Sequence, residues 1–187
     1  FEADSVLLSG TSAGGLATIS DAAYPTAKFA DTIAGIGGVA ELDLDTLGKL
    51  LTGKQASAST SINEVTESVS GRASVRDLET MFQLLHLRIT APRKDDDAIA
   101  VWRANLTENL MNREKSPDYQ FSVQSSDVLY QNNLRRKATK PADVAKIDVD
   151  KALAFYKDRF ADVGDFTFVI VGTIDLADPA DGGVQAD

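Results

Sequence analysis

Residues 48–55, GKLLTGKQ, come within one residue of the nucleotide-binding signature G-x-x-x-x-G-K-[ST]. A phosphate loop follows a strand, cradles phosphate with its backbone amides and uses the final hydroxyl to hold magnesium. This segment has the reverse order, because it ends a predicted helix and leads into a predicted strand, and Gln55 replaces the hydroxyl residue. We therefore expect a helix-to-strand junction capped by Gly53, and no nucleotide site.

The only histidine of the chain is His86, and there is no cysteine. A zinc site takes three or four ligands from His, Cys and carboxylates, and this chain lacks the donors for an ordinary zinc centre. The lack of cysteine also excludes disulfides and cysteine nucleophiles, but it leaves the redox compartment open. We predict that His86 is a partly buried polar residue on the flank of an apolar helix.

Other patterns that suggest chemistry have simpler structural explanations. Asp95, Asp96 and Asp97 lack the spacing of a calcium loop, and they suit the N-terminus of a helix. No G-x-S-x-G elbow is present, which disfavours a serine hydrolase. The glycosylation sequon at Asn105 falls inside a predicted helix. We therefore assign no catalytic, cofactor-binding or metal-binding residue.

Charge and composition restrict the class of protein. The chain of 187 residues has 19 Lys and Arg against 28 Asp and Glu, a formal charge of -9 that would repel a nucleic-acid backbone. The only dense cationic run, residues 135–137, is explained as a solvated helix end. No apolar run approaches the ~20 residues of a membrane span. The composition favours one globular α/β or α+β domain, and the start at Phe1 suggests a piece of a longer protein.

Hydrophobic periodicity and capping residues predict the elements. The first part is expected to contain a strand at 5–10, a glycine break at 14–15, helices at 24–36 and 43–51, and an antiparallel hairpin at 55–71. The remainder is expected to contain a helix capped by Ser74, a helix starting near Asp95, helices at 118–134 and 149–160, and a strand at 165–172.

The helix after Ser74 has the most continuous apolar stripe. The stripe consists of Val75, Leu78, Phe82, Leu85 and Ile89 and is widened by Met81, Leu84 and Leu87. Its centre, Phe82 and Leu85, is predicted to pack across the sheet that contains Phe168 and Ile170, because two-layer burial requires such a contact. The strand at 165–172 is nearly all apolar, which indicates an interior strand. On this basis Phe82→Ala should cost ~3 to 5 kcal/mol.

Several landmarks together resemble the insulinase/pitrilysin family of zinc metallopeptidases. They are LTGK followed by a small-residue hairpin, DLETMFQLLHL, and FYKDRF leading to FTFVIVG, and the similarity extends over about residues 5–175. The resemblance implies an α+β two-layer sandwich, in which helices cover a mainly antiparallel sheet. It implies a single noncatalytic domain at 1–175, most like the third domain of a long bacterial member. Residues 176–187 are expected to be a linker or tail.

An active member of the family carries H-x-x-E-H on a helix early in its first domain, where two histidines bind zinc and the glutamate activates water. The corresponding helix here resembles PTAKFADTIAGIGG. This placement puts Ala27, Ala30 and Asp31 at the first histidine, the base and the second histidine, so all three functional groups are missing. Glu108 falls near the expected third ligand, but helical geometry places it opposite the apolar stripe, and it stays unassigned.

The resemblance implies the noncatalytic half of a periplasmic or otherwise extracytoplasmic zinc protease. This domain would form part of the wall of a closed peptide-degradation chamber and hold a peptide extended against a sheet edge. Zinc would come from another domain of the same polypeptide. The alternative is a structural or binding module of the same fold with no proteolytic role. Both hypotheses predict an inactive isolated fragment, and an H-x-x-E-H helix in the parent chain would distinguish them.

Overall fold

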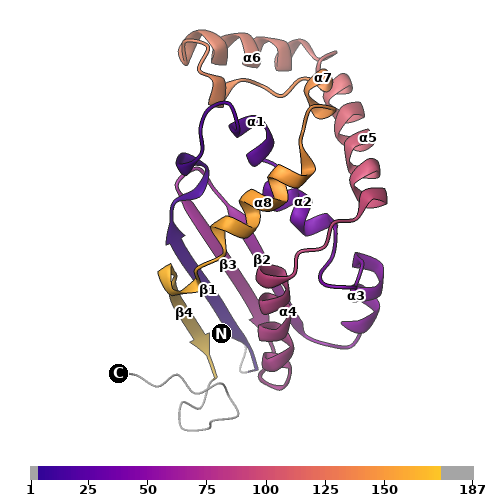
Figure 1. Cartoon of the computed structure of the whole chain (residues 1–187), viewed down its shortest axis with the longest axis vertical. Helices are drawn as coiled ribbons and strands as arrows, with labels where there is room; N and C mark the ends of the chain where they lie inside the picture. The colour runs from indigo at the N-terminus through magenta and orange to yellow at the C-terminus, as the bar shows by residue number, and fades with distance from the viewer. Residues whose placement is uncertain (1–3, 174–187) are drawn as a thin grey trace.

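A computed structural model describes residues 4–173, in which four antiparallel strands form one layer (Figure 1). The strands, in the order of the sheet, are β2 (Ala56–Ile62), β3 (Thr66–Ala73), β1 (Val6–Ala13) and β4 (Thr167–Gly172). Ala73 of β3 lies opposite both Ala56 and Val6, and Val6 also lies opposite Gly172. The predicted hairpin is therefore confirmed, as is the α+β class.

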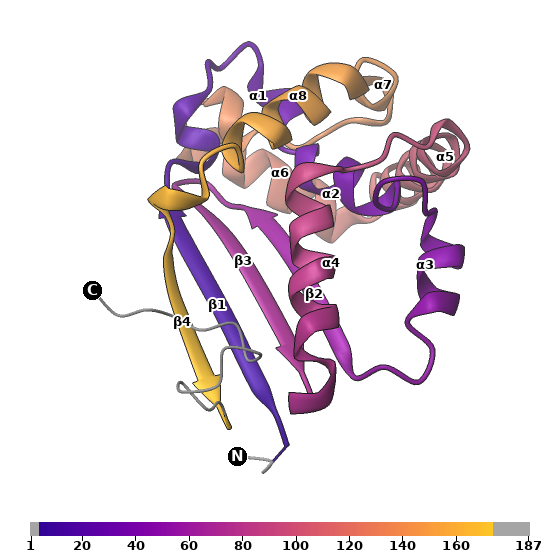
Figure 2. The same ribbon diagram turned by 60° about the horizontal axis from the view of Figure 1, so that its bottom comes forward.

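The second layer consists of helices. They are α1 (Tyr24–Ala27), α2 (Ala30–Ile36), α3 (Leu44–Leu50), α4 (Leu78–Thr90), α5 (Asp96–Arg113), α6 (Pro117–Leu129), α7 (Pro141–Val144) and α8 (Val149–Arg159). Helices α4 and α8 cross one face of the sheet, and α5 and α6 extend from one end of the molecule (Figures 1 and 2). None of the helices within residues 4–173 is long and apolar enough to cross a membrane.

Helix α4 packs on the sheet as predicted, but through a different stripe. Its buried side chains are Leu78, Met81, Leu84 and Leu85. Phe82 is 37% exposed, so the prediction that it lies at the centre of the core is wrong. At about 100° per residue, the buried stripe is turned toward Met81, which leaves Phe82 and His86 on the outer side of the helix. His86 is accordingly exposed rather than partly buried.

Strand β4 lies at an edge of the sheet, and the prediction of an interior strand is wrong for the described residues. Phe168, Val169 and Val171 are 39%, 55% and 42% exposed. The apolar side chains of β4 are therefore not fully covered by other parts of residues 4–173. Helix α4 packs mainly on β2 and β3, in the half of the sheet away from β4. The prediction that this helix lies across the sheet that contains Phe168 and Ile170 is therefore confirmed.

Two predicted helices have different boundaries in the structure. The helix predicted at 24–36 is divided into α1 and α2, because the backbone at Phe29 leaves the helical conformation. The Phe29 ring then packs edge-on against Trp102 of α5, with 5.5 Å between centroids. The helix predicted at 118–134 ends at Leu129, since Gln131 and Asn132 adopt positive φ angles of 51° and 58°.

The predicted helix starts are confirmed. The side chains of Asp43, Ser74, Asp95 and Asp148 each accept a hydrogen bond from a backbone N–H of the following turn. These caps satisfy amides that have no partner inside the helix. The predicted domain boundary at 175 and the linker at 176–187 lie outside the described residues.

Candidate functional site

The segment that resembles the zinc-binding helix is packed as a structural element. Ala27 is 2% exposed and lies in a small cluster with Leu16 and Tyr24, whereas Ala30 is 0% exposed and belongs to the main core. Both methyl groups are enclosed by neighbouring side chains, which would have to move to admit the larger side chain of a histidine or glutamate. These two positions therefore contribute packing and no chemical group.

Asp31 takes part in a hydrogen-bonded chain that joins four elements. Thr60 Oγ1 on β2 lies 3.2 Å from Asp31 Oδ1 and 2.9 Å from the hydroxyl of Tyr156 on α8, and it donates its single hydrogen to one of these two oxygens at a time. The Tyr156 hydroxyl donates to the Arg88 carbonyl oxygen of α4 at 3.0 Å. Burial raises the pKa of Asp31, and burial raises the pKa of Tyr156 to about 12. Tyr156 thus stays protonated at neutral pH, and the chain acts as a cross-link between α2, β2, α8 and α4.

These residues do not fit a zinc ion. Of the three positions that the resemblance implies, Ala27 and Ala30 carry methyl groups, and Asp31 is hydrogen-bonded to Thr60. Between residues 4 and 173, no three or more histidine, aspartate and glutamate side chains form a group that could hold a metal ion. We therefore derive no metal-dependent step from this helix.

Glu108 is exposed on α5, in agreement with the interpretation of a solvated residue. It lines a surface groove between α5 and α7 together with Met111 and Val144. Asp31 is hydrogen-bonded to Thr60 of β2, whereas Glu108 lies in the groove between α5 and α7, so these two acidic residues have different neighbours.

The nucleotide-like segment forms the predicted helix-to-strand junction. Helix α3 ends at Leu50, and Gly53 has a positive φ of 81° before β2 begins at Ala56. The Lys54 ammonium lies 3.4 Å from Asp77 Oδ1, and the Gln55 amide donates to Asp77 Oδ2 at 2.9 Å. The lysine and one amide of the apparent phosphate loop are therefore bound to a buried carboxylate.

Sequence reasoning missed a buried carboxylate, Glu67, which is 2% exposed. Its Oε1 accepts a hydrogen bond from the Gly15 amide at 2.8 Å and lies 3.4 Å from Arg159 Nη1. A Cβ on Gly14 would lie 2.8 Å from the same oxygen, so this glycine permits the close approach of the turn. Glu67 shares the inward-facing period of β3 with Val69, which is the sequence signal that could have identified it.

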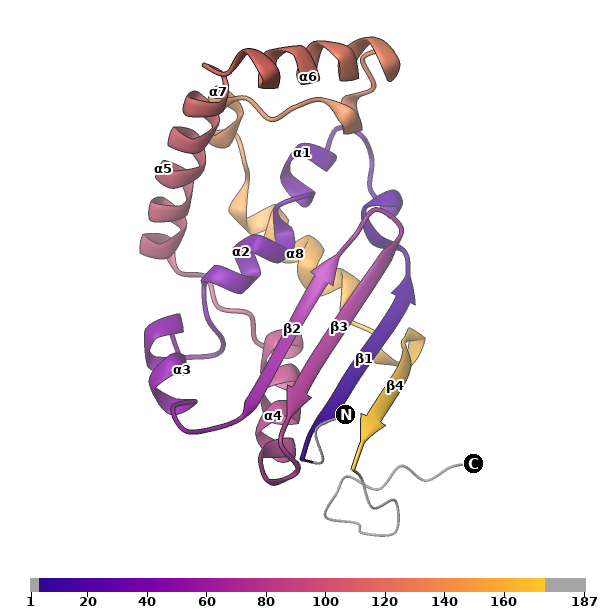
Figure 3. The same cartoon turned by 180° about the vertical axis from the view of Figure 1, so that it is seen from behind.

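The sheet face opposite α4 and α8 is not covered by any described helix (Figure 3). Ser70 of β3 is flanked by Ser9 of β1 and Ser59 of β2, and the Ser59 and Ser70 hydroxyls are 2.8 Å apart. The remaining hydroxyl residues in the same alternation are Thr11, Ser57, Ser61, Thr66, Ser68 and Thr167. This face is therefore built mainly from small hydroxyl side chains on β2, β3 and β1. It also carries Leu7 and Arg72 toward one end and the exposed Val169 and Val171 on β4.

Comparisons with known proteins agree with this fold. No protein-family model matches the chain. The zinc protease PQQL-like of Arabidopsis thaliana is 26% identical over 175 residues, which are 92% of this chain and 16% of the relative. The chain spans only 15% to 17% of the length of the curated relatives it matches.

Solved structures show the same fold. The periplasmic protease PqqL of Escherichia coli superposes with a TM-score of 0.78 at 23% identity, covering 94% of this chain and 19% of that one. The peptidase M16 inactive domain of Pseudomonas fluorescens gives 0.73 at 17% identity, covering 97% and 44%. The fold is thus that of an M16 peptidase domain, and the resemblance to the insulinase/pitrilysin family is confirmed. Sequence relatives also include the probable zinc proteases PqqL of Haemophilus influenzae and Escherichia coli, at 23% and 26% identity over 87% and 73% of this chain.

Proposed function

We propose that the chain is a noncatalytic domain of a zinc-dependent metalloendopeptidase and forms part of the wall of a closed peptide-degradation chamber. The observation that supports this proposal is that Ala27 and Ala30 are buried and Asp31 is hydrogen-bonded to Thr60, at the three positions where the resemblance implies zinc ligands and the catalytic base. A fold can retain its packing after its catalytic groups are lost, because fold and site are separable. The inactive M16 domain of similar fold supports this separation.

The uncovered sheet face is the surface that suits a chamber wall. Its serine and threonine side chains are small, so they leave room for an extended peptide, and their hydroxyls solvate the wall. At one side of this face, β2 pairs only with β3 among the described residues, which leaves its outer backbone edge available for strand addition. Main-chain hydrogen bonds at such an edge give affinity that tolerates different sequences.

Other domains of the same polypeptide are the proposed partners, and one of them would hold the zinc. Two exposed apolar surfaces support this: the edge strand β4, and the side of α6 where Phe121, Val128 and Leu129 are 74%, 78% and 75% exposed. Exposed apolar side chains gathered on one element commonly mark a protein contact. A periplasmic or otherwise extracytoplasmic location is proposed by analogy with the periplasmic relative, although another relative comes from a plant.

The wall can be tested in the parent polypeptide with Ser70→Trp, which places a large ring on the uncovered face. We expect slower cleavage of a long peptide and little change for a short fluorogenic peptide, because only the long substrate needs the space along the wall. Gln83→Trp, on the exposed side of α4, is the matched control and should change neither rate. Equal effects of the two substitutions would contradict the assignment of this face.

A further inference from the structure

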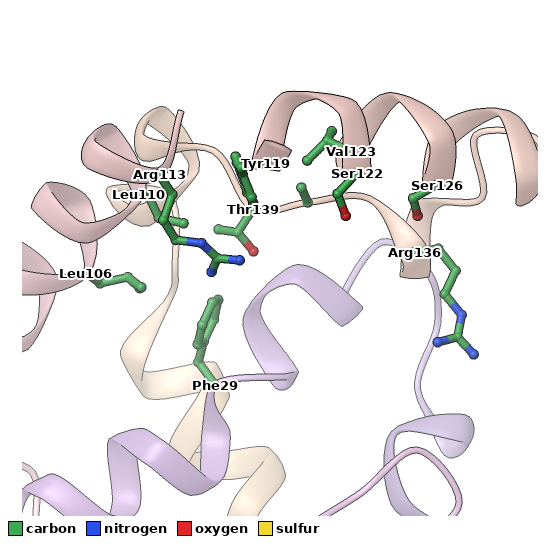
Figure 4. Close-up of a pocket in the computed structure, with 11 residues that line it drawn as sticks. Phe29, Leu106, Leu110, Arg113, Tyr119, Ser122, Val123, Ser126, Arg136 and Thr139 are labelled. Atoms are coloured by element: carbon green, nitrogen blue, oxygen red, sulfur yellow. The ribbon is translucent and has the colours of Figure 1, made fainter. Parts of the chain in front are cut away.

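A cavity of about 400 Å³ lies between α5, α6 and the segment that contains Thr139 (Figure 4). Phe29, Leu106 and Leu110 supply its apolar side, and the α6 side carries the hydroxyls of Ser122 and Ser126. No aspartate or glutamate of the described residues lines it. The size falls in the ~300 to 1,000 Å³ range of small-ligand sites.

Arg113 is the central charged group of this cavity. Its side chain extends from α5 into the space above Phe29 (Figure 4). The guanidinium stacks on the Tyr119 ring at 4.5 Å from the centroid, and it forms no ion pair with a carboxylate between residues 4 and 173. Arg136, at the other end, contacts the Tyr130 ring at 5.3 Å and likewise has no carboxylate partner there. Because the Arg136 guanidinium points away from Phe29 and Thr139 (Figure 4), Arg113 is the guanidinium that faces the cavity, in a chain with a formal charge of -9.

A lysine adds positive charge next to the same cavity. The Lys28 ammonium donates to Thr139 Oγ1 at 2.5 Å, and burial lowers the pKa of Lys28. Because Thr139 accepts this bond, its own hydroxyl hydrogen is available to a ligand. A second cavity of about 490 Å³ shares Phe29 and Thr139 with the first. Its lining contains Lys28, Lys137, Lys140 and Lys146 against Asp21 and Asp143.

We propose that the cavity beside Arg113 binds the C-terminal residue of a peptide. The planar guanidinium can hold the terminal carboxylate through two parallel hydrogen bonds, with further donors from Thr139 and Ser122. Phe29, Leu106 and Leu110 would receive an apolar side chain, which inorganic anions lack. The choice of a peptide as the ligand rests on the proposed function. The binding of a free carboxylate at Arg113 does not itself require protease activity.

The test is a titration of the 187-residue chain with an N-acetylated tetrapeptide that ends in leucine, as the free acid and as the C-terminal amide. Calorimetry should show that the free acid binds at least about tenfold more tightly, equivalent to about 1.4 kcal/mol. Arg113→Gln should remove this preference, and Arg113→Lys should retain part of it. Lys115→Gln makes the same charge change two residues further on, outside the cavity lining, and should keep the preference.

Two more variants test the cavity without removing a charge. Ser122→Phe should fill the space and weaken binding of the free acid, whereas Gln124→Phe, on α6 but outside the lining, should not. Circular dichroism verifies that each variant folds. Equal affinity for acid and amide, loss of the preference in Lys115→Gln, or displacement by acetate as effective as by N-acetylleucine would each overturn the proposal. If the parent cleaves peptides while the acid and amide bind equally, the carboxylate site alone fails and the proposed function stands.

Discussion

Met81 of α4 lies so close to Gly71 of β3 that a Cβ built on the glycine would be 2.6 Å from the Met81 sulfur. Met81 is 0% exposed, so its side chain fills the space between the helix and the sheet. The missing side chain at Gly71 thus sets how closely α4 approaches the sheet.

Gly71→Ala should destabilise the chain by about 1 to 3 kcal/mol, because the added methyl group overpacks this contact. In a Met81→Ala background the same substitution should cost less, since the space it needs is already free, and the two changes should couple by about 0.5 kcal/mol or more. Urea denaturation of the single and double variants measures the coupling. Strictly additive free energies would show that the contact does not set the spacing.

The corrected position of α4 reverses an expected ranking of side chains. Met81→Ala should cost about 2 to 5 kcal/mol through lost burial and a residual cavity. Phe82→Ala should cost less than Met81→Ala, because Phe82 is 37% exposed. His86→Gln, at an exposed position, should stay within about 0.5 kcal/mol of the parent chain. If chemical denaturation ranks Phe82→Ala as the most damaging variant, the orientation of α4 is wrong.

The buried Glu67 should contribute far more to the free energy of unfolding than the exposed Asp158, which contacts the same arginine, Arg159. Glu67→Ala removes the acceptor of the Gly15 amide and the partner of Arg159, and should cost about 1.5 to 3 kcal/mol. Asp158 lies 2.6 Å from Arg159 Nη2 but its side chain is 65% exposed, so Asp158→Ala should cost under about 1 kcal/mol. Thermal denaturation of the two variants compares them directly, and similar losses would argue against a structural role for the buried pair.

Asp77 should make the free energy of unfolding depend on pH in the acidic range. The Gln55 amide, followed by Ser74, Arg76 and Lys54, lowers the pKa of Asp77 to about 2. Because an ordinary aspartate titrates near pH ~3.9, the unfolded chain takes up the proton first as the pH falls. The stability advantage over Asp77→Asn should therefore be constant above about pH 4 and decline between about pH 4 and pH 2.

Denaturation curves of the two chains across this pH range measure the difference. A difference that stays constant from about pH 6 to pH 2 would show that the Asp77 carboxylate is not held in its ionised form by the fold.

Local signals explain which parts of the fold could be predicted. Asp95 and Asp148 start helices by bonding amides only a few residues away, so their sequence patterns were sufficient. At the helix break, Phe29 packs against Trp102, which is distant in sequence, and the exposure of β4 depends on which strands lie beside it. Likewise, the cavity at Arg113 exists only because α5 and α6 are arranged around Phe29, and no sequence spacing indicates it.

The noncatalytic character of this domain can be measured on dialysed samples of the parent polypeptide and of the 187-residue chain, by determining zinc content and peptide cleavage together. We expect the parent polypeptide to retain stoichiometric zinc and to cleave peptides in a chelator-sensitive manner, and we expect the 187-residue chain to do neither. A parent with neither zinc nor cleavage would support the structural module instead. Stoichiometric zinc on the 187-residue chain would contradict the assignment of a noncatalytic domain.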